Sequence, residues 1–375
     1  MLNPKTIDDA SIEQRVYQLN LGPQHPSTHG VMHLLVTLDG EVVIKLEPVI
    51  GYSHRGHEKM AENRTYEQFL PNPPRMDYLS GMIFNHGYCM AVEKLCGIEV
   101  PRRAEYIRVI TAELNRIASH FIGAMDYAMG LGAITPFLWG WDDREHILDL
   151  LEGIAGSRLT YSYSRFGGVR NDITKDFYDG TRRFIDRLRG RFWDYENLIN
   201  QNIIFIKRSQ DVGVITKEAA LAYGVTGPTL RGSGVAYDVR KQEPYSVYPE
   251  FTFEIPTREA GDCLARYQVR MAEMEQSLNI IEQALDRLPP GPIRSKVPRF
   301  VTPPPGDCYC TFESARGEAG FYIVSDGSRI PYRIKVRAPS FSNLFVLTEI
   351  CPGHFLADVI AIFGSIDVTV PEIDR

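Results

Sequence analysis

Residues 22–30 read Gly-Pro-Gln-His-Pro-Ser-Thr-His-Gly, so two histidines, two hydroxyl side chains and two prolines stand close together. His33 follows, and two strand-like runs, residues 34–38 and 42–46, flank the pair Asp39-Gly40. An Asp-Gly pair between two such runs predicts a β-hairpin, because both turn residues need a positive φ. We therefore expect the histidine stretch to be a loop that leads into the first strand of the hairpin.

The chemistry of this loop leaves three roles open. His25, His29 and His33 are four residues apart and would line one face of a helix, as a metal site requires. However, Pro26 lacks a backbone donor and Gly30 is a poor helix former, so no helix is expected there. The residue types favour a loop that handles protons or binds a ligand over a purely structural loop, and a metal site comes third.

The composition is that of an ordinary soluble globular chain. Of the 375 residues, 44% are hydrophobic and 23% are charged, and the formal net charge of −6 gives no electrostatic footprint for nucleic acid. No apolar run is long enough to span a bilayer, and the first fifteen residues lack the apolar stretch of a signal peptide. We expect a cytoplasm-like compartment, with any membrane association peripheral or through partners.

The cysteines give no metal-binding pattern. Six are present, at positions 89, 96, 263, 308, 310 and 351. None forms a Cys-x-x-Cys pair, and none has a histidine at zinc-finger spacing. We therefore expect free thiols and no metal cluster held by this chain.

Hydrophobic periodicity predicts long helices in the middle of the chain and strands near its end. The long helices are expected at residues 75–98, 104–129, 142–164, 177–207 and 258–288, and shorter ones near 59–68, 217–223 and 354–363. The strands are expected at residues 308–315, 319–325 and 332–338. Asp142 and Asp143 indicate the capped start of one helix, and Tyr78 falls in the first turn of another.

The predicted fold class is α+β. A central bundle of long helices is expected, with β hairpin and sheet elements contributed by both chain ends. We divide the chain into an N-terminal β region with the histidine loop (1–60), a helical bundle with an irregular segment at 210–256 (61–300), and a C-terminal β/α region (301–375). The last region is expected to pack back on the N-terminal loop.

Six motifs, spread over essentially the whole chain, carry a resemblance to a known family. They are residues 22–30, His54-Arg55-Gly56-x-Glu58-Lys59, Asp77-Tyr78, and residues 91–95, 132–137 and 363–375. In this order they resemble the D subunit family of proton-pumping NADH:quinone oxidoreductase, respiratory complex I. The resemblance implies a fold related to the large subunit of nickel–iron hydrogenases.

The hydrogenase activity itself is not expected. Hydrogenases hold their metal with two cysteine pairs, one near each chain end, whereas the corresponding regions here, Gly51–His57 and Asp367–Pro371, contain no cysteine. The cavity that holds the metal centre in hydrogenases would instead face quinone. A non-catalytic scaffold in a related complex remains a second alternative.

The resemblance implies a peripheral-arm subunit of an enzyme, a translocase that is not active as this chain alone. Electrons from the terminal 4Fe-4S cluster of the neighbouring B subunit would reduce quinone, coupled to proton pumping. The C subunit, the I subunit and the membrane arm are the other implied partners, and FMN and NADH would bind elsewhere in the complex. The implied location is the cytoplasmic face of the cell (inner) membrane. The module that selects NADH or another electron donor lies outside this chain.

Quinone reduction needs protons as well as electrons, and therefore hydrogen-bond donors at the two carbonyl oxygens. A histidine titrates near neutral pH, and a tyrosine phenol stays protonated there. By the family match, His29 and Tyr78 are the catalytic residues that hold the headgroup, and His25 lies on the same loop. The match places His54 and Arg55 near the partner's iron–sulfur cluster.

Two positions depart from the common pattern of the family. Many members have an aspartate where this chain has Gly130, and Asp126, one helical turn earlier, is expected to face the same way and to bind the quinone. Many members also have a histidine near the cluster where this chain has Thr160. The pH dependence of the cluster potential is therefore expected to be weak.

Overall fold

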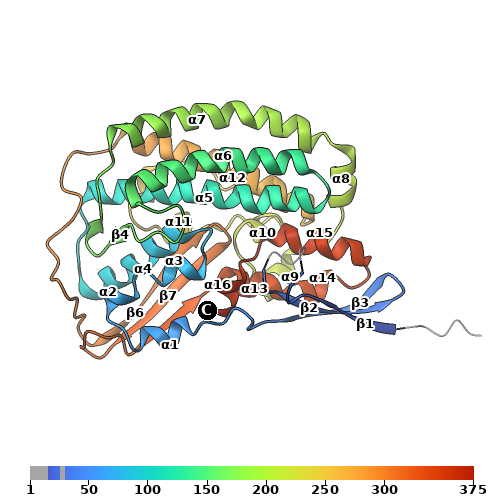
Figure 1. Cartoon of the computed structure of the whole chain (residues 1–375), viewed down its shortest axis with the longest axis horizontal. Helices are drawn as coiled ribbons and strands as arrows, with labels where there is room; N and C mark the ends of the chain where they lie inside the picture. The colour runs from blue at the N-terminus through green and yellow to red at the C-terminus, as the bar shows by residue number, and fades with distance from the viewer. Residues whose placement is uncertain (1–15, 26–29) are drawn as a thin grey trace, which may run out of the picture.

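The computed structural model describes residues 16–25 and 30–375. Four long helices run side by side across the upper part of the molecule, and the sheets and short helices lie below them (Figure 1). The four are α5 (Arg102–Gly130), α6 (Ile134–Ala155), α7 (Lys175–Tyr195) and α12 (Cys263–Asp286). The prediction of an α+β chain with a central bundle is confirmed.

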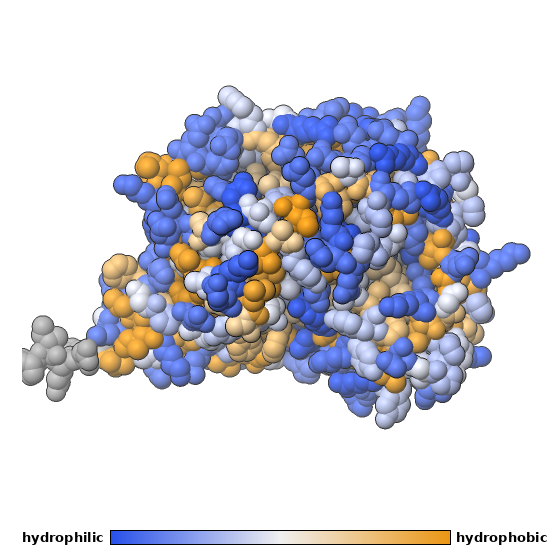
Figure 2. Space-filling model, turned by 180° about the vertical axis from the view of Figure 1, so that it is seen from behind, coloured by the Kyte–Doolittle hydropathy of each residue, from blue (hydrophilic) through white to orange (hydrophobic). Residues whose placement is uncertain are grey.

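The N-terminal sheet projects from the body of the molecule (Figure 1). It is antiparallel, in the order β1-β2-β3, and consists of β1 (Val16–Leu21), β2 (His33–Asp39) and β3 (Val42–Val49). The predicted hairpin is confirmed, but Asp39 pairs with Val42, so the turn residues are Gly40 and Glu41. Seen from behind, the projecting sheet exposes hydrophobic side chains (Figure 2), among them Val16, Val42 and Ile44.

The C-terminal sheet packs against the helix α4 (Gly81–Cys96). Its antiparallel strands are β6 (Gly306–Ser314), β7 (Gly317–Ser325) and β8 (Arg333–Arg337), close to the predicted ranges. Phe84 of α4 meets the rings of Phe312 and Phe321 edge to face. A Cβ atom at Gly87 would lie 2.3 Å from the Phe312 ring, so this close approach requires glycine.

The last residues of the chain pack against β3 and against the segment that follows it. They form α13 (Pro339–Phe345), α14 (Leu347–Ile350), α15 (Leu356–Ile366) and α16 (Val370–Asp374). Val43 N donates to His354 O at 2.9 Å, and the Asp374 carboxylate accepts from Gly51 N at 2.8 Å and Ser53 N at 2.7 Å. The division into three regions at residues 60 and 300 stays a prediction.

The predicted helix at residues 75–98 is wrong at its start. Pro73 and Pro74 open a separate short helix, α3 (Pro73–Met76), and α4 begins only at Gly81. Between them the Asp77 carboxylate accepts hydrogen bonds from Leu79 N and Ser80 N, which holds a turn instead of a helix. Tyr78 therefore lies in this turn and not in the first turn of a helix.

The predicted helix start at Asp142 and Asp143 is also wrong, because both residues lie inside α6. Asp143 is buried and accepts from Tyr195 OH at 2.7 Å and Arg187 Nε at 3.0 Å. These acids join α6 to α7 and do not cap a terminus. The helix ends at Ala155 and not near residue 164, and a small hairpin follows, β4 (Ser164–Arg165) and β5 (Gly168–Val169).

The predicted helix at 177–207 is broken. It consists of α7, a π-helical turn (Glu196–Asn200) and α8 (Ile203–Ser209), which starts where Asn202 Oδ1 accepts from Ile204 N. The helix expected near 59–68 is likewise two helices. The remaining helices are α1 (His57–Ala61), α2 (Tyr66–Phe69), α9 (Lys217–Ala222), α10 (Gly227–Arg231), α11 (Val239–Gln242) and a 3-10 turn (Tyr248–Glu250). Throughout residues 16–25 and 30–375, the helices are too short or too polar to cross a membrane.

Candidate functional site

A cavity of about 410 Å³ opens where α5, α6 and the C-terminal segment meet. It combines apolar and polar side chains, as ligand pockets usually do. Its lining residues come from four parts of the chain: Tyr78 and Leu79; Ile122, Gly123, Asp126 and Met129; Trp141, Arg144 and Leu159; and Phe363, Gly364, Asp367, Val368 and Thr369. The structure thus brings two predicted site residues, Tyr78 and Asp126, into one cavity.

Tyr78 presents a phenol to this cavity. Its side chain is 37% exposed, and its hydroxyl has no hydrogen-bond partner among the residues that the structure describes. Burial raises the pKa of Tyr78, Arg316 opposes this, and the nearby carboxylates of Asp77, Asp367 and Asp126 raise it further. The phenol is therefore protonated at neutral pH and can donate to a ligand oxygen.

Asp126 lies on α5, one turn before Gly130, and lines the same cavity. Gly130 does not belong to the lining, and a Cβ atom there would meet only Ile360, at 4.0 Å. Gly123, one helical turn before Asp126, differs from Gly130 because its position leaves no room for a side chain. A Cβ atom at that position would lie 2.4 Å from Asp367 Oδ2, so the missing side chain lets the carboxylate approach α5.

The wall behind Tyr78 is held by buried ion pairs. Arg316, at the turn between β6 and β7, places Nη1 3.1 Å from Asp77 Oδ2 and Nη2 3.0 Å from Asp367 Oδ1. Arg270 of α12 donates to the carbonyl oxygens of Ser365 at 2.6 Å and Ile366 at 2.9 Å. These contacts fix the segment around residue 367, which supplies five of the lining residues.

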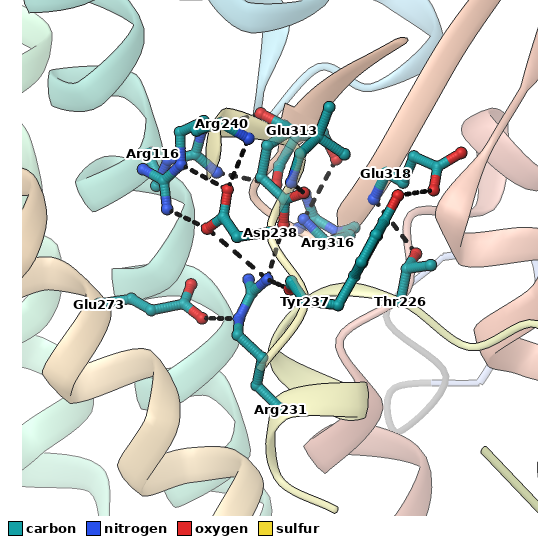
Figure 3. Close-up of polar contacts among 12 residues, drawn as sticks. Arg116, Thr226, Arg231, Tyr237, Asp238, Arg240, Glu273, Glu313, Arg316 and Glu318 are labelled. Atoms are coloured by element: carbon teal, nitrogen blue, oxygen red, sulfur yellow. Dashed lines mark hydrogen bonds and ion pairs between the residues drawn. The ribbon is translucent and has the colours of Figure 1, made fainter. Parts of the chain in front are cut away.

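Deeper in the molecule, a second group of buried charges ties the bundle to the C-terminal sheet (Figure 3). Arg231 lies between two carboxylates, with Glu273 of α12 at 2.5 Å and Glu313 of β6 at 2.9 Å. Arg240 pairs with Asp238 at 2.6 Å. Burial raises the pKa of Glu273, but Arg231 and His120 outweigh it and lower that pKa to about 2. Each of these charges has an opposite partner, which indicates a structural cluster.

Gly30, the last residue of the histidine loop, lies beside the same C-terminal segment. His25 and Gly30 form an isolated β-bridge, and a Cβ atom at Gly30 would lie 3.4 Å from the side chain of Val370. Val370 follows directly on Thr369, a residue of the cavity lining. His29, the predicted headgroup ligand, lies outside the described residues.

His54 and Arg55 do not line the cavity. His54 Nδ1 donates to the carbonyl oxygen of Asp374 at 2.6 Å, and Arg55 Nη2 donates to that of Arg75 at 2.6 Å. The neighbouring His57, which the sequence did not single out, is buried. Burial and the charge of Arg55 lower the pKa of His57 to about 4.

A larger groove of about 550 Å³ lies between α6 and α7 and contains none of the predicted site residues. Its charged side chains include Asp149, Arg183 and Arg187. In the described parts of the chain, no three histidine, cysteine, aspartate or glutamate side chains converge as a metal site would require. The six cysteines are free thiols.

Sequence reasoning missed Asp367 and Arg144 as members of the cavity. Asp367 lies within the motif at residues 363–375. It is an acidic residue between the end of a predicted helix and Pro371, and this position could have marked it as a candidate. Arg144 stands in a run of charged residues, Asp-Asp-Arg-Glu, that resembles a solvated helix start. Only the packing distinguishes it from its neighbours.

The sequence matches the family described as "Respiratory-chain NADH dehydrogenase, 49 Kd subunit" over residues 130–305 and 299–375. It is 60% identical to the D subunit of the NADH-quinone oxidoreductase of Syntrophobacter fumaroxidans, over 98% of each chain. The corresponding protein of Desulfotalea psychrophila is 56% identical over 96% of this chain and 97% of its own. That of Geobacillus kaustophilus is 51% identical over 95% and 97%. The chain therefore belongs to the family of the 49 kDa subunit of respiratory-chain NADH dehydrogenase.

Proposed function

We propose that this chain is the subunit of an NADH-quinone oxidoreductase that binds the quinone headgroup, and that the headgroup enters the cavity at Tyr78. One observation carries the proposal. A phenol without a partner among the described residues and the Asp126 carboxylate line one cavity, and the segment that completes this cavity lies beside Gly30, which ends the histidine loop and bridges to His25. The curated relatives of this chain are named as subunits of such an oxidoreductase.

The chemistry of the site follows from the reaction. Reduction of a quinone to a quinol adds two electrons and two protons, one proton to each carbonyl oxygen. Tyr78 donates a hydrogen bond to one oxygen, and His29 serves the other; both hold the headgroup and pass protons to it. Asp126 acts beside them, in the place of the aspartate that many members carry at position 130. His25, on the same loop, contacts the quinone.

The electrons come from a partner. The terminal 4Fe-4S cluster belongs to the B subunit, and His54 and Arg55 face it across the interface. The C subunit, the I subunit and the membrane arm are the other partners of this chain, which lies on the cytoplasmic side of the cell membrane. FMN and NADH bind elsewhere in the complex. Protonation changes around His29 begin the coupling to proton pumping.

The proposal is tested in membranes that carry Tyr78→Phe or His29→Ala, with Tyr332→Phe as a matched control because Tyr332 is 69% exposed. Quinone reductase activity is compared with the reduction of an artificial acceptor that bypasses the quinone. We expect the first activity to fall at least about tenfold in the two site variants, with acceptor reduction unchanged. Equal loss of both activities together with complex content would make these residues structural and support the scaffold alternative.

A further inference from the structure

Arg144 is a buried cation that has no counter-ion within the described residues. Its side chain is on α6, is 5% exposed and lines the cavity that also contains Tyr78. Its Nε atom is buried and has no hydrogen-bond partner in the described structure. The guanidinium carbon lies 5.4 Å from the centre of the Trp141 ring, a cation–π contact that positions the group without accepting its hydrogen bonds.

The carboxylates that stand near Arg144 in sequence are engaged elsewhere. Asp143 binds Arg187 and Arg191 of α7, and Glu145 binds Arg158. Four other deeply buried arginines have a carboxylate partner: Arg108 with Glu93, Arg116 with Glu113, Arg231 with Glu273 and Arg316 with Asp77. Arg266 has no carboxylate partner, but its guanidinium donates to the carbonyl oxygens of Gly213 and Gly261 and to Ser365 Oγ. Within the described structure, Arg144 is thus paired with no acid, and it faces a cavity.

A buried cation without such a partner destabilises the empty site. Burial and the charge of Arg158 lower the pKa of Arg144, and Tyr161, Glu145 and Tyr78 oppose that effect. An arginine nevertheless stays charged at neutral pH, because its ordinary pKa is very high. Its unused donors are satisfied when a ligand with an acceptor oxygen occupies the cavity, which recovers the lost hydrogen bonds.

We propose that Arg144 is a substrate-binding residue that donates hydrogen bonds to an oxygen of the quinone headgroup. This inference rests on the proposed function of the cavity. As electrons arrive, negative charge develops on the carbonyl oxygens before protons reach them, and a fixed guanidinium lowers the energy of that charge. Arg144 gives up no proton, so both protons of the quinol still come from the other groups of the site and from solvent.

The test uses the intact complex in membranes with Arg144→Met and Arg144→Lys, and with Arg183→Gln as the matched control. Arg183 is an exposed arginine on α7, outside this cavity. Quinone reductase kcat and KM are measured per assembled complex, together with reduction of the artificial acceptor. We expect kcat/KM for quinone to fall about tenfold to a hundredfold in Arg144→Met, from loss of a charged hydrogen bond. Arg144→Lys keeps the charge and should lose less.

Two outcomes overturn the inference. One is a wild-type kcat/KM per complex in both Arg144 variants, and the other is an equal loss of quinone and acceptor activity. Tyr78→Phe in the same assay separates this inference from the proposed function. If Tyr78→Phe lowers quinone reduction and Arg144→Met does not, only the role of Arg144 is wrong; if neither lowers it, the cavity is not the quinone site.

Discussion

Arg316 and Asp77 form a fully buried ion pair directly behind Tyr78, with Nη1 3.1 Å from Oδ2. The same arginine reaches Asp367 at 3.0 Å on the opposite side. Asp77 also accepts from Leu79 N and Ser80 N and so shapes the turn that carries Tyr78. One guanidinium therefore fixes both the turn with the phenol and the segment with Asp367.

This pair predicts a severe effect of Asp77→Leu. Removal of one partner leaves Arg316 buried with a single carboxylate, a change that typically costs about 3–5 kcal/mol. We expect less assembled complex in membranes and a lower midpoint of thermal inactivation. Lys45→Leu, which removes an exposed ion pair with Glu47, is the control and should leave both quantities nearly unchanged. Equal midpoints for the two variants would contradict the role of the buried pair.

The position of Asp126 predicts that a carboxylate at residue 130 of α5 can partly replace it. Asp126→Asn removes the charge from the cavity and should lower quinone reductase turnover several-fold and shift its pH profile. Gly130→Asp, added to that variant, restores a carboxylate one helical turn away and should recover part of the turnover. The measurement is kcat against pH in the single and double variants. If Asp126→Asn has the wild-type turnover and pH profile, Asp126 has no part in the reaction.

The close approach at Gly123 predicts an effect of a single methyl group. In Gly123→Ala the new Cβ atom would lie 2.4 Å from Asp367 Oδ2, so the carboxylate must move and the cavity changes shape. We expect a higher KM for quinone and a loss of stability of about 1–3 kcal/mol. The control is Gly153→Ala on α6, where the added atom meets nothing within 4 Å. An unchanged KM in Gly123→Ala would contradict this view of the cavity wall.

His57 predicts a pH-dependent stability. Its pKa is about 4 in the folded chain, through burial and the charge of Arg55, against 6.5 when exposed. The unfolded chain therefore binds the extra proton first, so the contribution of His57 is fully present above pH 6.5 and is lost as the pH falls through 4. The loss amounts to roughly 3 kcal/mol at most.

The measurement for His57 is the thermal inactivation midpoint of the complex between about pH 7.5 and pH 5, where the unfolded chain takes up the proton. The midpoint should fall less steeply towards acid in His57→Gln than in the wild-type complex. His54→Gln is the matched control, because that side chain is a neighbour on the same segment. Parallel pH dependences in the wild type and in His57→Gln would exclude the predicted linkage.

Periodic patterns of hydrophobic residues correctly predicted the elements whose formation depends on neighbouring residues in the sequence. The hairpin at β2 and β3 and the helix α5 follow from strand alternation and from an apolar face repeated over many turns, and both are confirmed. The turn at Tyr78 was not predictable in this way. It depends on Asp77, whose buried partner Arg316 lies 239 residues further along the chain.

The same limit applies to the charged residues of α6. Asp143 resembled a helix cap in the sequence, yet it is buried against Tyr195 and two arginines of α7. Arg144, its neighbour, has no such partner among the described residues and faces the cavity. Which of two adjacent charges is paired depends on the packing of α6 against α7, and a single sequence does not display that packing.

The most direct test of the quinone site is photolabelling of the intact complex with a quinone that carries a photoreactive group on its ring. Labelled peptides are identified by mass spectrometry, with and without an excess of unlabelled quinone. We predict labels on the cavity lining, around Tyr78, Met129 and residues 367–369, that the excess quinone suppresses. Suppressible labels in the groove between α6 and α7, with none in the cavity, would contradict the proposal.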